Sequence, residues 1–323
     1  MSTLTPPIST YLDHLRIERR LSPRTLTIYT QHLTQLEAAL AGKAWAVVSQ
    51  HDIRLMASQR HAAGLDGRTI AGMLSSWRGF FAWLGKQGLC TYNPVQGVRA
   101  PKVAQRLPKA LSVDMTQQLL NEPNPATLKN DNDEADHPLA LLRDQAMMEL
   151  LYSAGLRISE LVNLDVQPFD GRHRPNYSSQ GYVDLAAAEL TVLGKGQKRR
   201  TVPVGRVALA ALEKWLTARA EWPQIQCAEA LFLSARGLRI SPVVVRQRLA
   251  TMAQRAGLPT HVHPHMLRHS FASHILQSSG DLRAVQELLG HANISTTQIY
   301  TRLDWQHLAK AYDAAHPRAK KQD

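Results

Sequence analysis

The stretch NPVQGVRAPKVAQRLPKALS, residues 93–112, constrains the fold of this chain more than any other feature. It combines prolines and basic residues and has no helical period, which is typical of an extended connection. The 323 residues are enough for a hydrophobic core on each side of it. We therefore predict one domain over residues 1–98, a linker over 99–110 and a second domain over 111–323.

The positive charge is concentrated in the first third of the chain. The formal net charge is +12, and residues 1–110 hold 14 Lys and Arg against 5 Asp and Glu. This excess predicts a polyanionic partner and makes the first domain a candidate clamp for phosphates. A basic surface that serves only solubility is the alternative on charge alone.

Composition argues against membrane and disulfide-based classes of protein. No apolar run reaches the roughly 18 residues that a membrane span needs. The stretch MSTLTPPISTYLDHLRIERR lacks the apolar region of a signal peptide, so we expect a cytoplasmic protein without membrane contact. Cys90 and Cys227 are far apart in sequence, which argues against a disulfide framework.

The first domain is predicted to be helical. Ser22 and Pro23 form a helix start for LSPRTLTIYTQHLTQLEAAL, and Asp52 is predicted to cap a later short helix. RTIAGMLSSWRGFFAWLGKQG predicts another helix. Its aromatic residues could stack on bases, but their spacing favours core packing. They are Trp77, Phe80, Phe81 and Trp83.

The second domain has mixed signals, so the fold class is mainly α with a small β-sheet or hairpin. LALLRDQAMMELLYSAG predicts a helix ended by Gly155. AELTVLGKGQKRRTVPV predicts a hairpin with a Gly-Lys-Gly turn. The remainder from Val204 onward is predicted to be helical with tight corners.

Two basic positions near predicted turns are candidates for binding an anion. Arg157 opens a predicted helix, where its guanidinium and the backbone N–H groups could bind the same anion. Glu160 could hold this guanidinium in place. A surface ion pair is the alternative. Lys195 lies on the hairpin turn and could meet the minor groove or a leaving oxygen. Its neighbours Lys198, Arg199 and Arg200 are candidate phosphate anchors, or a solvated basic face.

Two further segments carry histidines and a tyrosine. HVHPHMLRHSFASHIL has no usual zinc spacing, so we expect no metal site. Instead Pro264 can start a helix with His265 and Arg268 on a polar face that suits a phosphate. In LGHANISTTQIYTRLD, Gly290 is predicted to end one helix before a second helix begins. His291 lies at this bend, and Tyr300 lies nine residues further along. Taken alone, Tyr300 is more typical of packing than of chemistry.

Several motifs occur together in an order that resembles the tyrosine recombinases. They are AGLRISELVNLD, LGKGQKRRTVPVG, HVHPHMLRHSFASHIL, SSGDLRAVQELLGHANISTTQIYTRLD and YDAAHPRAK, with LSPRTLTIY and NPVQGVRAPK before them. Within this family the chain is most similar to the Xer group and its XerC branch. The resemblance spans nearly the whole sequence.

The resemblance implies a fold and an active site. The first domain would be a helical, SAM-like core-binding domain that clamps DNA, and the second a mixed α/β catalytic domain. The catalytic residues implied are Arg157, Lys195, His265, Arg268, His291 and Tyr300. Tyr300 would form a 3′-phosphotyrosyl bond, and no cofactor or metal would be needed.

The resemblance also implies partners. They are a dif-like double-stranded DNA site, a XerD-like second recombinase in a heterotetramer, and an FtsK-like DNA translocase. The C-terminal tail would couple neighbouring subunits, or pack on its own chain. A phage- or transposon-type integrase and a non-catalytic DNA-binding protein are the alternatives. The loops 121–138 and 169–184 are longer than the family pattern, and the second could alter how Lys195 is presented.

Overall fold

The computed structural model describes residues 5–102, 110–121, 138–170, 175–194, 198–259, 261–279 and 281–289. The chain forms two compact units, Met1–Arg106 and Leu107–Asp323, which we describe one at a time. No helix in these described ranges is both long enough and apolar enough to cross a membrane.

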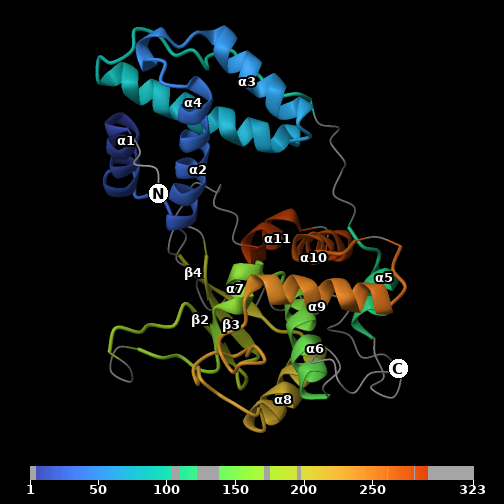
Figure 1. Ribbon diagram of the computed structural model, residues 1–323. Coiled ribbons are helices and arrows are strands. Elements are labelled where there is room, and N and C mark those ends of the chain that lie inside the picture. The colour runs from blue at the N-terminus through green and yellow to red at the C-terminus, as the bar shows by residue number, and fades with distance from the viewer. Residues whose placement is uncertain are drawn as a thin grey trace. The chain divides into compact units, whose positions relative to one another are not determined.

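The first unit is a helical cluster around a long fourth helix. Its elements are α1 (Pro6–Ile17), α2 (Pro23–Leu40), the 3-10 turn η1 (Trp45–Val47), α3 (Gln50–Ala62) and α4 (Gly67–Lys86). Helix α4 packs against α1, α2 and α3 (Figure 1). Val95 and Val98 also pack into this core. The beginning of the proline-rich stretch is therefore part of the first unit, and not an extended linker.

The sequence predicted the N-cap residues of two helices in this unit, Ser22 and Asp52. Ser22 caps α2 as predicted, because its Oγ accepts a hydrogen bond of 3.2 Å from the Thr25 N–H. The prediction that Asp52 caps a helix is wrong. Ser49 caps α3, and Asp52 completes a capping box by accepting from the Ser49 N–H at 2.8 Å. Both residue types suit a cap, so spacing alone could not separate them.

The aromatic residues of α4 pack in the core, as predicted. Trp77, Phe80 and Phe81 are fully buried, whereas Trp83 is half-buried. The indole N–H of Trp77 donates to the backbone carbonyl of His32 at 3.0 Å. This bond satisfies the one polar atom of the buried ring and ties α4 to α2.

The second unit surrounds one helix with others and places a small sheet beside them. Its helices are α5 (Val113–Leu120), α6 (Pro138–Ser153), α7 (Ile158–Val162), α8 (Arg206–Ala220), α9 (Pro242–Arg255), α10 (Pro264–Ser279) and α11 (Leu282–Leu289). Its strands are β1 (Leu164–Asp165), β2 (Gly181–Asp184), β3 (Glu189–Leu193) and β4 (Arg199–Pro203). Helix α6 contacts α5, α7, α8, α9 and α10 (Figure 1).

The sheet confirms the predicted hairpin. The strand order is β1-β2-β3-β4, with β1 and β2 parallel and the other pairs antiparallel. Leu193 pairs with Arg199, so the segment that contains Lys195 connects β3 to β4. Lys195 itself lies outside the described residues.

The segment 169–184, which the sequence analysis treated as one long loop, connects β1 to β2, and its last residues, 181–184, are β2 itself. Several contacts hold its described part. The Tyr177 hydroxyl donates to both carboxylate oxygens of buried Asp165, and Arg239 pairs with the same carboxylate at 2.6 Å. The Arg199 guanidinium donates to the Ser179 carbonyl at 3.0 Å, which joins the loop to β4. The loop 169–184 is thus tied to the hairpin strand, while residues 171–174 and the acidic segment 122–137 lie outside the described ranges.

The chain enters the second unit through Leu111, which is held by α10. The Leu111 N–H donates to the Ser270 hydroxyl at 2.8 Å, and the Leu111 carbonyl lies 2.9 Å from Nε2 of buried His274. Since a carbonyl can only accept, Nε2 of His274 carries the proton, and Nδ1 accepts from the Tyr152 hydroxyl at 2.9 Å. A neutral imidazole therefore connects the entering segment at Leu111, α10 and α6.

We expect His274 to make stability dependent on pH. Burial lowers its pKa below the ordinary value of 6.5, partly opposed by the hydrogen bond to Leu111. The unfolded chain then takes up the proton first, so the contribution is complete above pH 6.5 and is lost as the pH falls below it. His274→Gln should lower the free energy of unfolding by about 1–3 kcal/mol near pH 7, with a smaller loss at about pH 5.

Chemical denaturation of wild type and variant across this pH range measures the difference. His269→Gln is the matched control, because His269 is exposed on the same helix. An equal loss for His274→Gln at both ends of the range would contradict the prediction.

Candidate active site

Arg157 and Glu160 form the first part of the site. Arg157 directly precedes α7, and its side chain donates to the Glu160 carboxylate at 2.7 Å. The same carboxylate accepts the Arg157 N–H at 2.8 Å. The predicted role of Glu160 in holding the guanidinium is therefore confirmed. The expected anion site on the backbone N–H groups is not, because Glu160 already occupies the Arg157 N–H and α7 is a single short turn.

Arg268 reaches the same place from α10. Its Nη1 lies 4.0 Å from a Glu160 oxygen and donates to the Gly155 carbonyl, while its Nη2 donates to the Leu289 carbonyl at 2.7 Å. The side chain is 10 % exposed. The sequence prediction put Arg268 on a polar face, but the structure buries it, with two backbone carbonyls as acceptors and Glu160 as an ion-pair partner.

Arg200 is a member of the site that the sequence analysis placed elsewhere. Its Nη1 and Nη2 donate to the two oxygens of Glu160 at 2.7 and 2.9 Å, a bidentate pair. Its Nε donates to the Leu288 carbonyl at 3.3 Å. The prediction that Arg200 is a phosphate anchor is wrong, because its donors face protein acceptors. The strand period was the available signal, since Arg200 lies two residues before buried Val202 on β4.

Two of these arginines bind the carboxyl end of α11. Arg200 and Arg268 donate to the carbonyls of Leu288 and Leu289, the last two residues of that helix. Carbonyls at a helix end lack partners within the helix and carry partial negative charge, so cations stabilise them. His291 follows Leu289 by two residues in the sequence. The arginine cluster therefore fixes the point from which the chain continues to His291.

The electrostatics of the cluster favour a bound anion. Burial raises the pKa of Glu160, but the hydrogen bonds and charges of Arg200 and Arg157 outweigh it and lower the pKa below its usual value. Burial and the nearby charges of Arg157 and Arg200 lower the pKa of Arg268 to about 10, although Glu160 opposes this. Three guanidinium groups thus face one carboxylate, and the positive excess is partly shielded from water.

Exposure separates the members of the cluster. The Arg157 side chain is 29 % exposed, against 13 % for Arg200 and 3 % for Glu160. Within the described part of the chain, the Arg157 side chain donates to one carboxylate oxygen, which leaves other N–H groups of its guanidinium for a ligand. Among these side chains Arg157 is the most accessible to a phosphate.

Gly155 allows α10 to approach the cluster. Its φ is +55°, and a Cβ there would lie 2.5 Å from Cδ1 of Phe271 on α10 and 3.2 Å from Cδ2 of Leu289. Only glycine fits both the backbone conformation and the close packing. Its carbonyl is also an acceptor for Arg268. Gly155 ends the helical segment as predicted, and it also holds the arginine from α10.

The histidines of the HVHPHMLRHSFASHIL motif have different roles. His265 is exposed near the start of α10, and its ring lies 6.5 Å from that of His263. Nδ1 of His263 accepts the Met266 N–H at 3.2 Å, so His263 caps α10, and His274 is part of the buried link to Leu111. Burial and the neighbouring His265 and His261 lower the pKa of His263. His265 is thus left at the surface, one helical turn before Arg268.

The structure brings together part of the predicted catalytic set. Arg157 and Arg268 meet around Glu160, and His265 lies on the same helix as Arg268. Lys195, His291 and Tyr300 lie outside the described residues. Their roles stay predictions.

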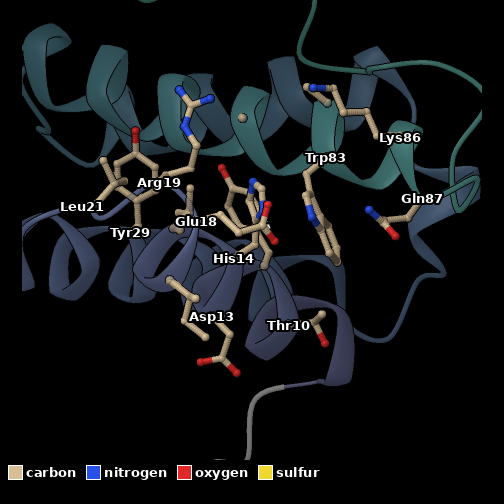
Figure 2. A pocket seen from close by; sticks show the side chains of 15 residues that line it. Thr10, Asp13, His14, Glu18, Arg19, Leu21, Tyr29, Trp83, Lys86 and Gln87 are labelled. Atoms are coloured by element: carbon tan, nitrogen blue, oxygen red, sulfur yellow. Dashed lines mark ion pairs between the residues drawn. The ribbon is translucent and has the colours of Figure 1, made fainter.

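A concave surface in the first unit includes none of these residues. Its volume is about 950 Å³, and it is lined by residues of α1, α2, α4 and the connection between α1 and α2, among them His14, Glu18, Arg19, Trp83 and Lys86. Figure 2 shows the Trp83 indole beside His14, and their ring centroids lie 6.5 Å apart. The mixture of acidic and basic residues at its rim does not indicate a phosphate site.

Comparison with known proteins assigns the chain to a family. The phage integrase family matches residues 124–307, and the N-terminal SAM-like domain of phage integrases matches residues 8–88. A curated relative, "Tyrosine recombinase XerC 1" of Ralstonia nicotianae, is 51 % identical over 327 residues, 98 % of this chain and 94 % of the relative. The chain belongs to the phage integrase family. It is therefore a tyrosine recombinase, a DNA strand-transferase, and its predicted resemblance to the Xer group and the XerC branch is confirmed.

Two solved structures share the fold. The crystal structure of λ integrase bound to DNA has a TM-score of 0.64 at 18 % identity and covers 100 % of this chain and 99 % of that one. XerH bound to its difH substrate before cleavage has a TM-score of 0.63 at 20 % identity and covers 96 % and 84 %. The expected fold class, mainly α with a small sheet, is confirmed for this family member.

We predict that Gly155→Ala disrupts the second unit at the arginine cluster. The new Cβ would be strained by the positive φ and would also displace Phe271, so we expect a loss of about 2–4 kcal/mol in unfolding free energy. Gly257→Ala is the matched control, since its φ is +65° with nothing within 4 Å of the Cβ position. It should cost only about 1–2 kcal/mol for the backbone conformation. Urea denaturation of both variants measures this, and equal losses would show that the contact with Phe271 is unimportant.

Proposed function

We propose that this tyrosine recombinase cuts and rejoins DNA at a specific site through a bond between Tyr300 and a 3′ phosphate. The meeting of Arg157 and Arg268 around one buried carboxylate supports this most directly, because these residues come from separate segments of the sequence. Their positive excess suits a phosphate diester.

Arg157 and Arg268 would stabilise the transition state of the phosphoryl transfer. Negative charge builds on the two non-bridging oxygens, and planar guanidinium groups donate to such oxygens in pairs. Because the cluster is preorganised by Glu160, little reorganisation is needed when the charge develops. Arg157 is accessible to the phosphate, and Arg268 supports it from the buried side.

The remaining predicted residues would move protons. The Tyr300 oxygen forms a bond to phosphorus while the bond to the 5′ oxygen breaks, and Lys195 gives that oxygen a proton. His265 and His291 would help remove the phenolic proton, since imidazole titrates near neutral pH and a phenol ordinarily near pH 10. The 5′ hydroxyl of a partner strand then attacks the phosphotyrosine and releases Tyr300. Because the side chains supply the charge, no cofactor or metal takes part in this scheme.

The physiological role we propose is resolution of chromosome dimers at cell division. The relative is named as a XerC recombinase, and XerH was crystallised with a difH substrate. By analogy the DNA would be a dif-like site, with a XerD-like partner in a heterotetramer and an FtsK-like translocase, all in the cytoplasm. The basic first domain would clamp the duplex, and the tail after Tyr300 would couple subunits. A phage- or transposon-type integrase would use the same chemistry on other targets.

The first test concerns the nucleophile. With a nicked suicide substrate, the wild type should accumulate a covalent protein–DNA adduct that is visible on a denaturing gel. Tyr300→Phe should form none, because the attacking oxygen is missing, whereas Tyr182→Phe, at a tyrosine of β2, should behave as wild type. Adduct formation by Tyr300→Phe would move the nucleophile to another residue.

The second test separates the two arginines. Arg157→Ala and Arg268→Ala should each slow cleavage by about 10²–10³, as for the loss of one transition-state donor. Arg268→Ala should also cost about 2–4 kcal/mol of stability, because the carbonyls of Gly155 and Leu289 lose their donor. Single-turnover cleavage and urea denaturation measure the two effects.

Arg219→Ala is the control for this comparison, because the Arg219 guanidinium donates to backbone carbonyls such as that of Ala230, away from the cluster. It should lose stability and keep its cleavage rate. Cleavage by Arg157→Ala at the wild-type rate would remove Arg157 from the catalytic set.

A further inference from the structure

Arg200 is nearly buried and donates to three acceptors within the protein, unlike a surface arginine that binds DNA phosphates. Its fork matches both oxygens of Glu160 at 2.7 and 2.9 Å, and its Nε reaches the Leu288 carbonyl. The three acceptors belong to α7 and α11, whereas Arg200 lies on β4. One side chain therefore connects three elements of the site.

Glu160 needs this partner because it is almost completely buried. A buried carboxylate with too few donors is unfavourable, and it attracts any nearby cation to satisfy its oxygens. The nearest cations besides Arg200 are Arg157 at 2.7 Å and Arg268 at 4.0 Å. Without Arg200 these two guanidinium groups would be drawn further toward Glu160.

The charges of the cluster lead to the same conclusion. With Arg200 present, one positive charge balances Glu160, and those of Arg157 and Arg268 remain in excess. Without it, the carboxylate would cancel half of the charge that the phosphate needs. The removal would also free the Leu288 carbonyl, at the end of the helix from which the chain continues to His291.

We propose that Arg200 is a positioning residue for strand transfer: its bidentate pair with Glu160 balances that carboxylate, and so leaves Arg157 and Arg268 aligned and charged toward the DNA phosphate. This inference rests on the proposed function of those two arginines. Arg200 does not itself contact the phosphate. Because β4 also flanks the segment of Lys195, the same pair fixes the turn end of the hairpin against α7.

The test compares two variants. The first removes Arg200, and the second also removes the charge of Glu160. Arg200→Met should slow single-turnover cleavage of a nicked substrate by about 10- to 100-fold, the effect of losing an outer-shell partner. Glu160→Gln in the Arg200→Met background should cleave faster than Arg200→Met alone, because the uncompensated charge is gone. It should recover at least about a third of the loss in the logarithm of the cleavage rate. Arg200→Lys should be intermediate, because an ammonium keeps the charge but lacks the fork.

Arg239→Met is the matched control for a purely structural effect. Arg239 also pairs with a buried carboxylate, Asp165 at 2.6 Å, but that pair lies outside the arginine cluster. It should lower the melting temperature as Arg200→Met does, while cleavage well below that temperature stays at the wild-type rate. A double variant Glu160→Gln/Arg200→Met that is as slow as Arg200→Met, or slower, would overturn the proposal.

A measurement without DNA separates this inference from the proposed function. In NMR spectra of ¹⁵N-arginine-labelled protein, Arg200→Met should shift the Nε–H signals of Arg157 and Arg268, and Glu160→Gln in that background should return them toward the wild type. Unchanged signals would overturn the positioning role even if cleavage is slowed. If instead the signals shift as expected but the wild type forms no covalent adduct, the proposed chemistry fails and the positioning role stands.

Discussion

The site depends on one buried carboxylate that organises three arginines. Glu160 accepts hydrogen bonds from Arg157 and Arg200 and lies 4.0 Å from Arg268. Guanidinium groups repel each other, so a cluster of three needs an anion within it to remain folded in the absence of DNA. Burial makes that anion costly unless its oxygens are satisfied, which explains why Glu160 receives a bidentate fork and a backbone N–H as well. The fold therefore stores positive charge at one place before any substrate binds.

Helix α10 transmits this arrangement to the rest of the second unit. Arg268 contributes to the cluster, and further along the same helix Ser270 and His274 hold Leu111, where the chain enters the unit. Gly155 is the point at which α10 approaches the segment of Arg157, and its missing Cβ sets their separation. A displacement of Leu111 would thus also displace α10, the helix that carries Arg268. This gives the entry of the linker a physical connection to the arginine cluster.

Local patterns predicted much of the fold and only part of the site. Apolar periods located α2 and α4, Gly155 marked the end of α6, and the Gly-Lys-Gly turn located the β3–β4 hairpin, because these features depend on neighbouring residues. The Asp52 cap was wrong because two suitable caps lie three residues apart. Arg200 was misread because its acceptor, Glu160, is 40 residues away, and spacing along the chain carries no information on such a pair. The burial of Arg268 was missed for the same reason, since its acceptors Gly155 and Leu289 come from other elements.

The differing exposure of the arginines suggests how the cluster serves both stability and chemistry. Arg200 uses its donors on Glu160 and on the Leu288 carbonyl, so in the proposed chemistry its charge acts on a phosphate through space, whereas Arg268 supports the phosphate from the buried side of the cluster. The attraction between such a charge and a phosphate is stronger where water is excluded, because the local dielectric constant is low. Arg157 is more exposed, and among the described residues its side chain donates only to Glu160, so in the proposed chemistry it binds a phosphate oxygen directly. A site with three exposed arginines would be screened by water and salt, and one with three buried arginines could not reach the DNA. The observed mixture meets both requirements, and it does so because Glu160 holds the exposed arginine against the buried pair.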